Sequence, residues 1–214
     1  MNQVIQDKMK REVMVIANIS LFKNYPRETL VYGSDEADFE AQILENFEFM
    51  VRGEAEQNFD YKQPITYAIV LNEKNEIFVY TRGDKNSAAG DARLHEKVSI
   101  GVGGHLEREE EHLENPIRDC LTRELEEEID LKQENISEIF PIGYINDDSN
   151  EVGKVHIGMA YVVKTKNFVP SMQDGELAHG AFKSFEEFMT MIKNPEYNIE
   201  SWTRLLAPEL EKYM

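Results

Sequence analysis

The sequence predicts a mixed α/β protein of the α+β type, with a mixed β-sheet and interspersed helices. Strand-like runs of β-branched and aromatic residues, separated by turn signals, dominate residues 64–102 and 137–163. Between these two stretches, Asn115 and Pro116 open a segment of helical periodicity that continues to residue 130. Such a mixture packs helices on a sheet around one core, and 214 residues fit one domain or one domain with an added arm.

Apolar spacing and capping residues predict a strand and a helix in the N-terminal region. Residues 13–17 predict a strand, and residues 34–35 provide a helix cap for the amphipathic segment that follows. Its apolar positions predict a face that packs on the core or on a second subunit. They are Phe39, Ile43, Leu44 and Phe47.

The central elements begin with a hairpin, whose strands at 65–71 and 77–80 are joined by a turn at 72–75. A strand at 98–102 runs into Gly103 and Gly104, and a helix over 116–130 follows an acidic loop. Further strands are expected at 139–145 and 155–163.

The C-terminal region predicts helices. Ser184 and Glu187 match a capping box that opens a helix toward residue 193. Residues 198–213 are helical in composition, and Pro208 is expected to kink or divide that helix.

Composition limits the classes of partner. Net charge is −18, from 41 acidic and 23 basic residues, which argues against nonspecific binding to nucleic acid. Cys120 is the single cysteine, so an intrachain disulfide is excluded and a reducing compartment is the simpler assumption. No run approaches the roughly 18 apolar residues of a membrane span. We expect a cytoplasmic protein without a nucleic-acid or membrane partner.

Three carboxylates share one patch of the helix predicted at 116–130. At about 100° per residue, Glu124 and Glu128 lie roughly 40° apart, and Glu127 lies roughly 60° to the other side of Glu124. Like charges this close repel one another unless a cation sits between them, and a hard divalent cation prefers oxygen ligands. The alternative is an ordinary solvated acidic helix in an acidic protein.

Residues 103–131 resemble the Nudix box, the signature of hydrolases that act on nucleoside diphosphates linked to another group. The resemblance extends to a hairpin strand that ends in Arg82, and to an acidic loop, an aromatic strand and a capped helix between 174 and 187. The flanks are also similar to a bacterial Nudix group described as predicted phosphoesterases, through residues 99–105 and 146–148. The positions that match the box are Gly103, Gly104, Arg123, Glu124, Leu125, Glu127, Glu128 and Leu131.

The resemblance implies a Nudix-like α/β/α sandwich with a mixed sheet. Residues 63–214 would form the Nudix hydrolase domain, and residues 1–62 an N-terminal extension that packs on it. The family pattern also makes a homodimer plausible.

Two positions depart from the pattern. The first Glu of the box falls at Asn115, beside Glu114, and the loop 105–114 is longer than in the family, so it carries an insertion. Asp130 stands where the family has Gly. That position follows the helix, where a left-handed conformation is useful, and Asp accepts this conformation better than most residues.

The resemblance implies a divalent-metal-dependent hydrolase of a diphosphate linkage in a small nucleotide-like substrate, with Mg²⁺ or Mn²⁺ as cofactor. Glu127 and Glu128 would bind the metal with the carbonyl of Gly103, and Glu176 would be the acidic ligand from outside the box. Asp148 and Glu151 compete with Glu176 for that role.

The catalytic roles that the resemblance implies fall on neighbouring residues of the box. Glu124 would bind metal or act as the general base, and Arg123 would orient a carboxylate. Arg82 matches a phosphate-contacting position of the family. Arg52, Arg93 and Lys97 are further basic candidates, each with a plain surface charge as the alternative.

Two other functions stay open. One is a binding or regulatory module that keeps the fold without turnover. The other is an isopentenyl-diphosphate isomerase, which Gly104-His105 and Asn150-Glu151-Val152 resemble, although the catalytic Cys of that branch would fall at Gly103. The five histidines show no zinc-binding spacing, which favours structural roles for them.

Overall fold

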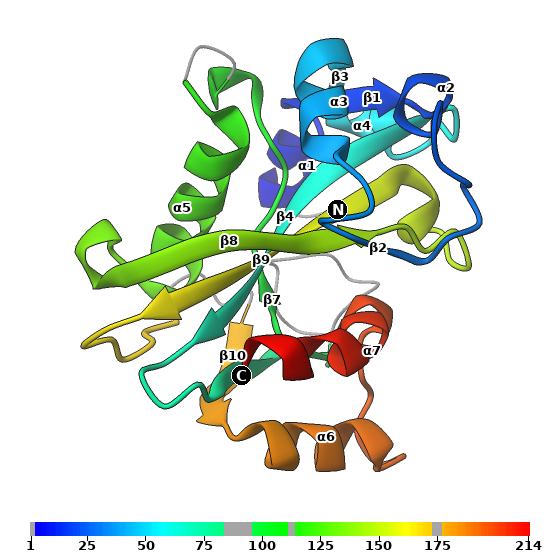
Figure 1. Cartoon of the computed structure of the whole chain (residues 1–214). Coiled ribbons are helices and arrows are strands. Elements are labelled where there is room, and N and C mark those ends of the chain that lie inside the picture. The colour runs from blue at the N-terminus through cyan, green and yellow to red at the C-terminus, as the bar shows by residue number, and fades with distance from the viewer. Residues whose placement is uncertain (1–2, 84–95, 111–113, 173–176) are drawn as a thin grey trace.

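A central mixed sheet organises the fold (Figure 1). The computed structural model describes residues 3–83, 96–110, 114–172 and 177–214. Across the sheet the strand order is β10 (Leu177–Lys183), β5 (Ile77–Arg82), β4 (Tyr61–Leu71), β9 (His156–Thr165), β8 (Ile136–Ile145) and β2 (Val31–Gly33). Two short strands lie beside this sequence of strands: β6 (Val98–Ser99) pairs with β5, and β7 (Gly101–Val102) pairs with β4.

The parallel pair β4 and β9 forms the centre of the sheet. Its register runs from Gln63 opposite His156 to Leu71 opposite Lys164, and the neighbouring pairs β8–β9 and β5–β10 are antiparallel. Strands buried on both faces read as continuous apolar runs, as the predicted strand at 65–71 does. The predicted mixed sheet is therefore confirmed.

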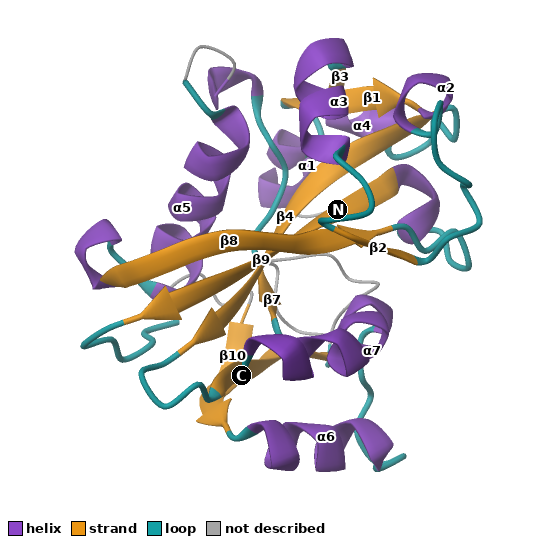
Figure 2. Ribbon diagram, in the orientation of Figure 1, coloured by secondary structure: helices purple, strands orange, loops and turns teal. Residues whose placement is uncertain are grey.

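Helices cover both faces of the sheet, so the layers are α/β/α, as expected (Figure 2). Alternate residues of β4 point to opposite cores: Ala68 and Val70 pack with the α5 side, while Ile69 and Leu71 pack with the α6 and α7 side. In the view of Figure 1, α5 (Pro116–Ile129) and α3 (Phe39–Asn46) lie above the sheet, and α6 (Phe185–Lys193) and α7 (Ser201–Leu206) lie below it.

The N-terminal region joins the sheet at the start of β4. Strand β1 (Glu12–Ala17) pairs with β3 (Glu48–Val51) and also with β4, through Ile16 opposite Lys62. The predicted boundary between residues 62 and 63 falls just after β4 begins, and the division into extension and domain stays a prediction. Short helices complete the region: α1 (Gln3–Lys8), α2 (Asn18–Leu21) and α4 (Arg52–Ala55).

The cap of the N-terminal amphipathic helix differs from the prediction. Helix α3 begins at Phe39, and Asp38, rather than residues 34–35, accepts the capping hydrogen bond from the amide of Ala41. Asp38 lies directly before the first helical residue, which is where a side-chain cap acts. Phe39 and Ile43 are fully buried in the core on the α5 side, so the prediction that this face packs is confirmed.

The C-terminal signals are confirmed. Ser184 and Glu187 form both hydrogen bonds of the capping box at the start of α6. Helix α7 ends at Leu206, and a 3-10 helix over Ala207–Tyr213 follows with Pro208 in its first turn. Proline therefore divides the C-terminal helix, because it cannot supply an amide donor.

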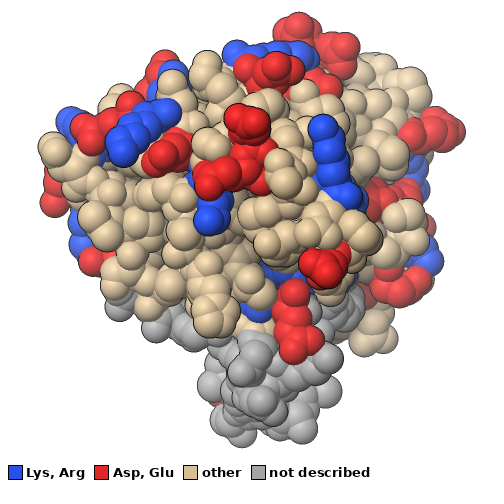
Figure 3. Space-filling view, turned by 90° about the horizontal axis from the view of Figure 1, so that it is seen from below, with Lys and Arg blue, Asp and Glu red and all other residues tan. Residues whose placement is uncertain are grey.

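The surface has mixed charge on the side of α6 and α7, where acidic and basic side chains are interspersed (Figure 3). Within the described ranges, no helix is long and apolar enough to cross a membrane.

Candidate active site

Helix α5 carries the predicted site residues, and a capping residue defines each of its ends. Asn115 caps the helix by accepting a hydrogen bond from the amide of Arg118 at 3.0 Å, and Pro116 occupies the first turn. The helix ends at Ile129, and the C-cap residue Asp130 has a left-handed φ of 58°, as the sequence predicts for this departure from the family pattern. Apolar side chains anchor one face in the core, among them Leu121 and Leu125.

Two glycines place the preceding loop against the helix. Gly103 has a φ of +147°, and a Cβ there would lie 2.1 Å from the Thr66 carbonyl oxygen. A Cβ at Gly104 would lie 2.5 Å from Oε1 of Glu124. The loop is therefore held against β4, and the missing side chain of Gly104 leaves the space that the Glu124 carboxylate occupies.

Arg123 contacts two of the α5 carboxylates. Its Nη1 lies 2.7 Å from Glu124 Oε1 and 3.2 Å from Glu127 Oε2, and its Nη2 donates to the His105 carbonyl at 3.2 Å. Burial lowers the pKa of Arg123, but Glu124 and Glu110 raise it by more, so the pKa lies above its ordinary value. The predicted role of Arg123 in orienting a carboxylate stays a prediction.

Glu110 is the site residue that sequence reasoning missed. It belongs to a 3-10 turn over Arg108–Glu110 and is only 6% exposed. Its carboxylate accepts from Arg123 Nε at 2.8 Å and from the amide of Glu107 at 2.8 Å. An acidic side chain thus reaches Arg123 from inside the longer loop, while Asn115, at the box position itself, serves as a helix cap.

The three predicted metal-binding glutamates of α5 differ in exposure. Glu127 is half-exposed and pairs with Arg123, whereas Glu128 is buried at 6% exposure. Burial raises the pKa of Tyr80, and the negative charge of Glu128 adds to that rise. The helix thus carries one carboxylate that is exposed to solvent, at Glu127, and one that is buried, at Glu128.

Arg82 extends from the end of β5 into a buried network. Its Nη2 lies 3.4 Å from Glu200 Oε1, and its guanidinium lies 5.8 Å from the centre of the Tyr80 ring. Burial lowers the pKa of Arg82, and Tyr80 and Glu200 raise it by more, so Arg82 stays charged. Its predicted contact with a phosphate stays a proposal.

The other predicted candidates lie apart or outside the described residues. Arg52 begins α4 and lies 3.8 Å from Glu56. Asp148 pairs with Lys62 at 2.5 Å and with Arg27 at 2.9 Å. The exposed Glu151 pairs with Lys154. Glu176 and Arg93 lie outside the described residues.

The donor set on α5 fits a hard divalent cation. Glu124, Glu127 and Glu128 offer carboxylate oxygens, the ligands that Mg²⁺ and Mn²⁺ prefer, and Gly104 leaves room for one of them beside the loop. Within the described ranges their oxygens do not form a group of three with all ligand atoms within 4.8 Å of one another.

Comparison with known proteins gives one close relative by sequence. The chain is 33% identical over 214 residues to protein YmaB of Bacillus subtilis, covering 95% of this chain and 99% of YmaB. No family model matches the chain.

Solved structures share the fold. The crystal structure of Tm1382, assigned to the Nudix hydrolases, superposes with a TM-score of 0.77 at 22% identity and covers 95% of this chain and 100% of Tm1382. A Nudix hydrolase from Alicyclobacillus acidocaldarius superposes with a TM-score of 0.55 at 13% identity, over 70% of this chain and 90% of its own.

Proposed function

This chain belongs to the Nudix superfamily, in the family that includes protein YmaB of Bacillus subtilis, and from that premise we propose that it is a divalent-metal-dependent hydrolase of a diphosphate linkage. The substrate would be a small nucleotide-like molecule, such as a nucleoside diphosphate derivative. The observation that carries the proposal is the close approach of Glu124 to the glycine loop, because it sets a carboxylate of α5 beside the backbone at Gly104, the residue after Gly103.

The α5 carboxylates would hold Mg²⁺ or Mn²⁺. Glu127 and Glu128 are the proposed ligands, with Glu124 and the Gly103 carbonyl beside them and Glu176 as a further acidic ligand. When bound, the metal supplies neutralisation of the diphosphate charge, orientation of the phosphates and a lowered pKa of bound water.

The chain's own residues would supply positioning and proton transfer. Glu124 would accept a proton from the attacking water, and Arg123 would hold that carboxylate in place through its contact at 2.7 Å. Arg82, charged at the end of β5, would contact the phosphates if the substrate displaces its contact with Glu200. Arg52 would contribute a second positive charge.

Two competing functions predict different behaviour. A silent binding module would bind nucleotide-like ligands without turnover. An isomerase of the isopentenyl-diphosphate type would rearrange its substrate without releasing phosphate, and the Cys of that branch is replaced here by Gly103. The absence of that Cys disfavours the isomerase, and turnover of a diphosphate substrate would distinguish the hydrolase from the silent module.

The proposal is tested by a panel of nucleoside diphosphate derivatives, dinucleoside polyphosphates and modified nucleoside triphosphates. We expect hydrolysis of at least one class with Mg²⁺ or Mn²⁺, its loss with a chelator, and its loss in Glu127→Gln/Glu128→Gln. If the wild type and the double variant behave identically across the panel, the assignment as a hydrolase is wrong.

A further inference from the structure

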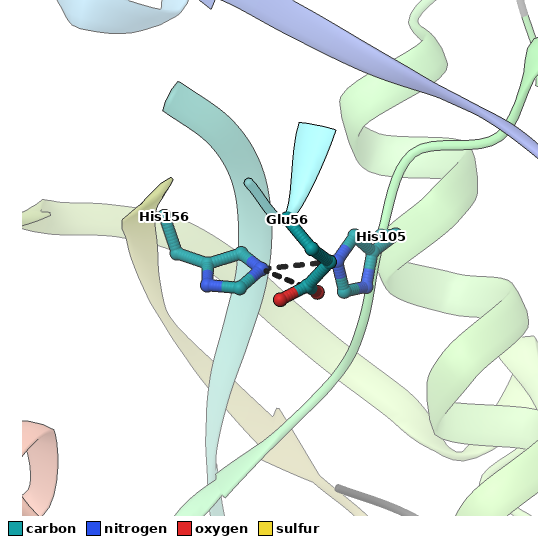
Figure 4. Close-up of side chains that lie close together, drawn as sticks. All are labelled: Glu56, His105 and His156. Atoms are coloured by element: carbon teal, nitrogen blue, oxygen red, sulfur yellow. Dashed lines mark hydrogen bonds and ion pairs between the residues drawn. The ribbon is translucent and has the colours of Figure 1, made fainter. Parts of the chain in front are cut away.

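A second group of potential metal ligands lies away from the α5 carboxylates. It consists of Glu56, His105 and His156, which we call the histidine cluster (Figure 4). The two Nε2 atoms of the histidines lie 3.2 Å apart, and His156 Nε2 lies 3.5 Å from Glu56 Oε1. One ligand atom from each residue lies within 4.8 Å of the other two.

The sheet brings the two histidines together. His156 begins β9 and lies opposite Gln63 of β4, whereas His105 bridges to Ile65 from the other side of β4. Gln63 and Ile65 are two residues apart, so they share one face of β4, and residues paired with them point to the same face. Both imidazoles therefore meet over β4.

Glu56 completes the cluster from the N-terminal region. It directly follows α4, and its side chain is 10% exposed. Arg52, one turn earlier, lies 3.8 Å from the same oxygen of Glu56.

The hydrogen bond of His156 defines its tautomer. Nδ1 lies 2.6 Å from the Val152 carbonyl oxygen, and a carbonyl can only accept, so Nδ1 carries the proton. In the neutral ring, Nε2 then presents its lone pair to Glu56 and His105. Metal-binding histidines are typically oriented through such a hydrogen bond from the other ring nitrogen to a carbonyl.

The spacing of the ligand atoms suits a tetrahedral zinc-type ion. Zinc–nitrogen bonds of roughly 2.0–2.1 Å at tetrahedral angles separate two ligand atoms by about 3.3 Å. The observed separations of 3.2 and 3.5 Å lie on either side of that value. Two imidazoles and one carboxylate are also a ligand set that zinc sites use, with a fourth position left for water or another ligand.

We propose that Glu56, His105 and His156 bind a zinc-type divalent cation at a site distinct from the α5 carboxylates. The two sites differ in chemistry, because imidazole nitrogen suits Zn²⁺ or Co²⁺ whereas carboxylate oxygen alone suits Mg²⁺. For His105 and His156 this proposal departs from the expectation from sequence spacing that the histidines are structural.

The two sites share one loop. His105 follows Gly104, which contacts Glu124, and the His105 carbonyl accepts from Arg123 Nη2 at 3.2 Å. A metal ion bound by the histidine cluster would therefore restrain His105, and with it the loop at Gly104 that contacts Glu124. Metal binding at the histidine cluster does not depend on hydrolysis, and it can be measured without a substrate.

The test uses the full chain after removal of metal with a chelator and dialysis into excess Mg²⁺. Co²⁺ is added while its visible absorption is followed, and Zn²⁺ is then added to displace it. We expect one equivalent of tetrahedral Co²⁺ per chain. We expect His105→Gln and Glu56→Gln each to weaken binding by more than about 100-fold, beyond what loss of a merely orienting group costs.

Two control variants separate this site from others. His179→Asn removes an exposed histidine outside the cluster, at a left-handed position that Asn tolerates, and should bind as the wild type does. Glu127→Gln/Glu128→Gln should also retain Co²⁺ binding. The proposal is overturned if the wild type takes up no Co²⁺ in excess Mg²⁺. It is equally overturned if either control variant loses the ion, or if Glu56→Gln keeps it.

Discussion

Arg123 Nε donates to the Glu110 carboxylate at 2.8 Å, joining the box helix to a turn inside the preceding loop. Glu110 is nearly buried, and Arg123 also contacts Glu124 and Glu127. The positions of the Glu124 and Glu127 carboxylates thus depend, through Arg123, on a residue outside the helix. The longer loop acts here as a structural support for Arg123.

The first prediction concerns Glu110. Glu110→Gln removes the negative charge opposite a partly buried guanidinium, so we expect the free energy of unfolding to fall by about 1–3 kcal/mol. Urea unfolding of purified variants measures the change. The matched control is Glu114→Gln, because Glu114 is exposed and lies next to the box position held by Asn115.

Glu114→Gln should change the free energy of unfolding by less than about 0.5 kcal/mol, as exposed substitutions usually do. Equal losses in the two variants would contradict the structural role of Glu110. A double-mutant cycle with Arg123→Gln adds a second measure, since residues in direct contact should show a coupling energy of at least about 0.5 kcal/mol.

The second prediction concerns Glu127. Glu127→Gln should reduce hydrolysis by about 100-fold, the scale expected when one charge-stabilising group is lost at a reacting centre. Stability should stay near the wild-type value, because the side chain is 51% exposed. The measurement is kcat on whichever diphosphate substrate the panel identifies, together with urea unfolding.

Its matched control is Glu126→Gln on the same helix. Glu126 is exposed and pairs with Lys132 at 2.7 Å, so its loss should leave turnover unchanged. If Glu126→Gln and Glu127→Gln reduce kcat to the same extent, the effect is one of general helix charge and the assigned role of Glu127 fails.

The third prediction separates the two glycines of the loop. At Gly104 an added Cβ meets the flexible end of Glu124, so Gly104→Ala should fold normally but displace that carboxylate and lower kcat by more than about 10-fold. At Gly103 an added Cβ meets the Thr66 backbone at 2.1 Å, so Gly103→Ala should lower thermal stability or prevent folding. Thermal unfolding and kcat distinguish them, and a Gly104→Ala protein with wild-type kcat would refute the assigned position of Glu124.

Much of the fold could be predicted because its signals are local. Asn115 and Pro116 start α5, and Ser184 and Glu187 start α6, through contacts within one turn of helix. The alternating cores of β4 follow from the period of a strand. The prediction that residues 34–35 cap α3 is wrong, because several acidic and hydroxyl residues there satisfy the same local rule and Asp38 is the one next to the helix.

Two groupings of side chains, one in the candidate active site and one in the histidine cluster, could not be predicted because they depend on tertiary geometry. Counting along the motif places the first box Glu at Asn115, whereas a 3-10 turn brings Glu110 to Arg123 from 13 residues away. The imidazoles of His105 and His156 are 51 residues apart and meet only through the register of β4 with its two neighbours. Spacing rules for metal motifs do not detect such a pair.

The fourth prediction concerns alkaline stability and Tyr144. The Tyr144 hydroxyl accepts from the amide of Glu40 at 3.3 Å, and burial raises the pKa of Tyr144 to about 12. The unfolded chain has a tyrosine pKa near about 10. Between these values the unfolded state loses the proton first, so the contribution of Tyr144 to stability is complete below about pH 10 and is lost as pH rises toward 12.

Tyr144→Phe removes this titration, so its free energy of unfolding should fall less steeply than that of the wild type. The gap between the two proteins should narrow by about 1 kcal/mol between pH 8 and pH 11, since one pKa unit corresponds to about 1.4 kcal/mol. Urea unfolding at the two pH values measures the gap. The control is Tyr197→Phe, at a side chain 40% exposed, whose gap from the wild type should be the same at both pH values. A gap for Tyr144→Phe that stays constant would show that its hydroxyl titrates alike in both states, against the effect of burial.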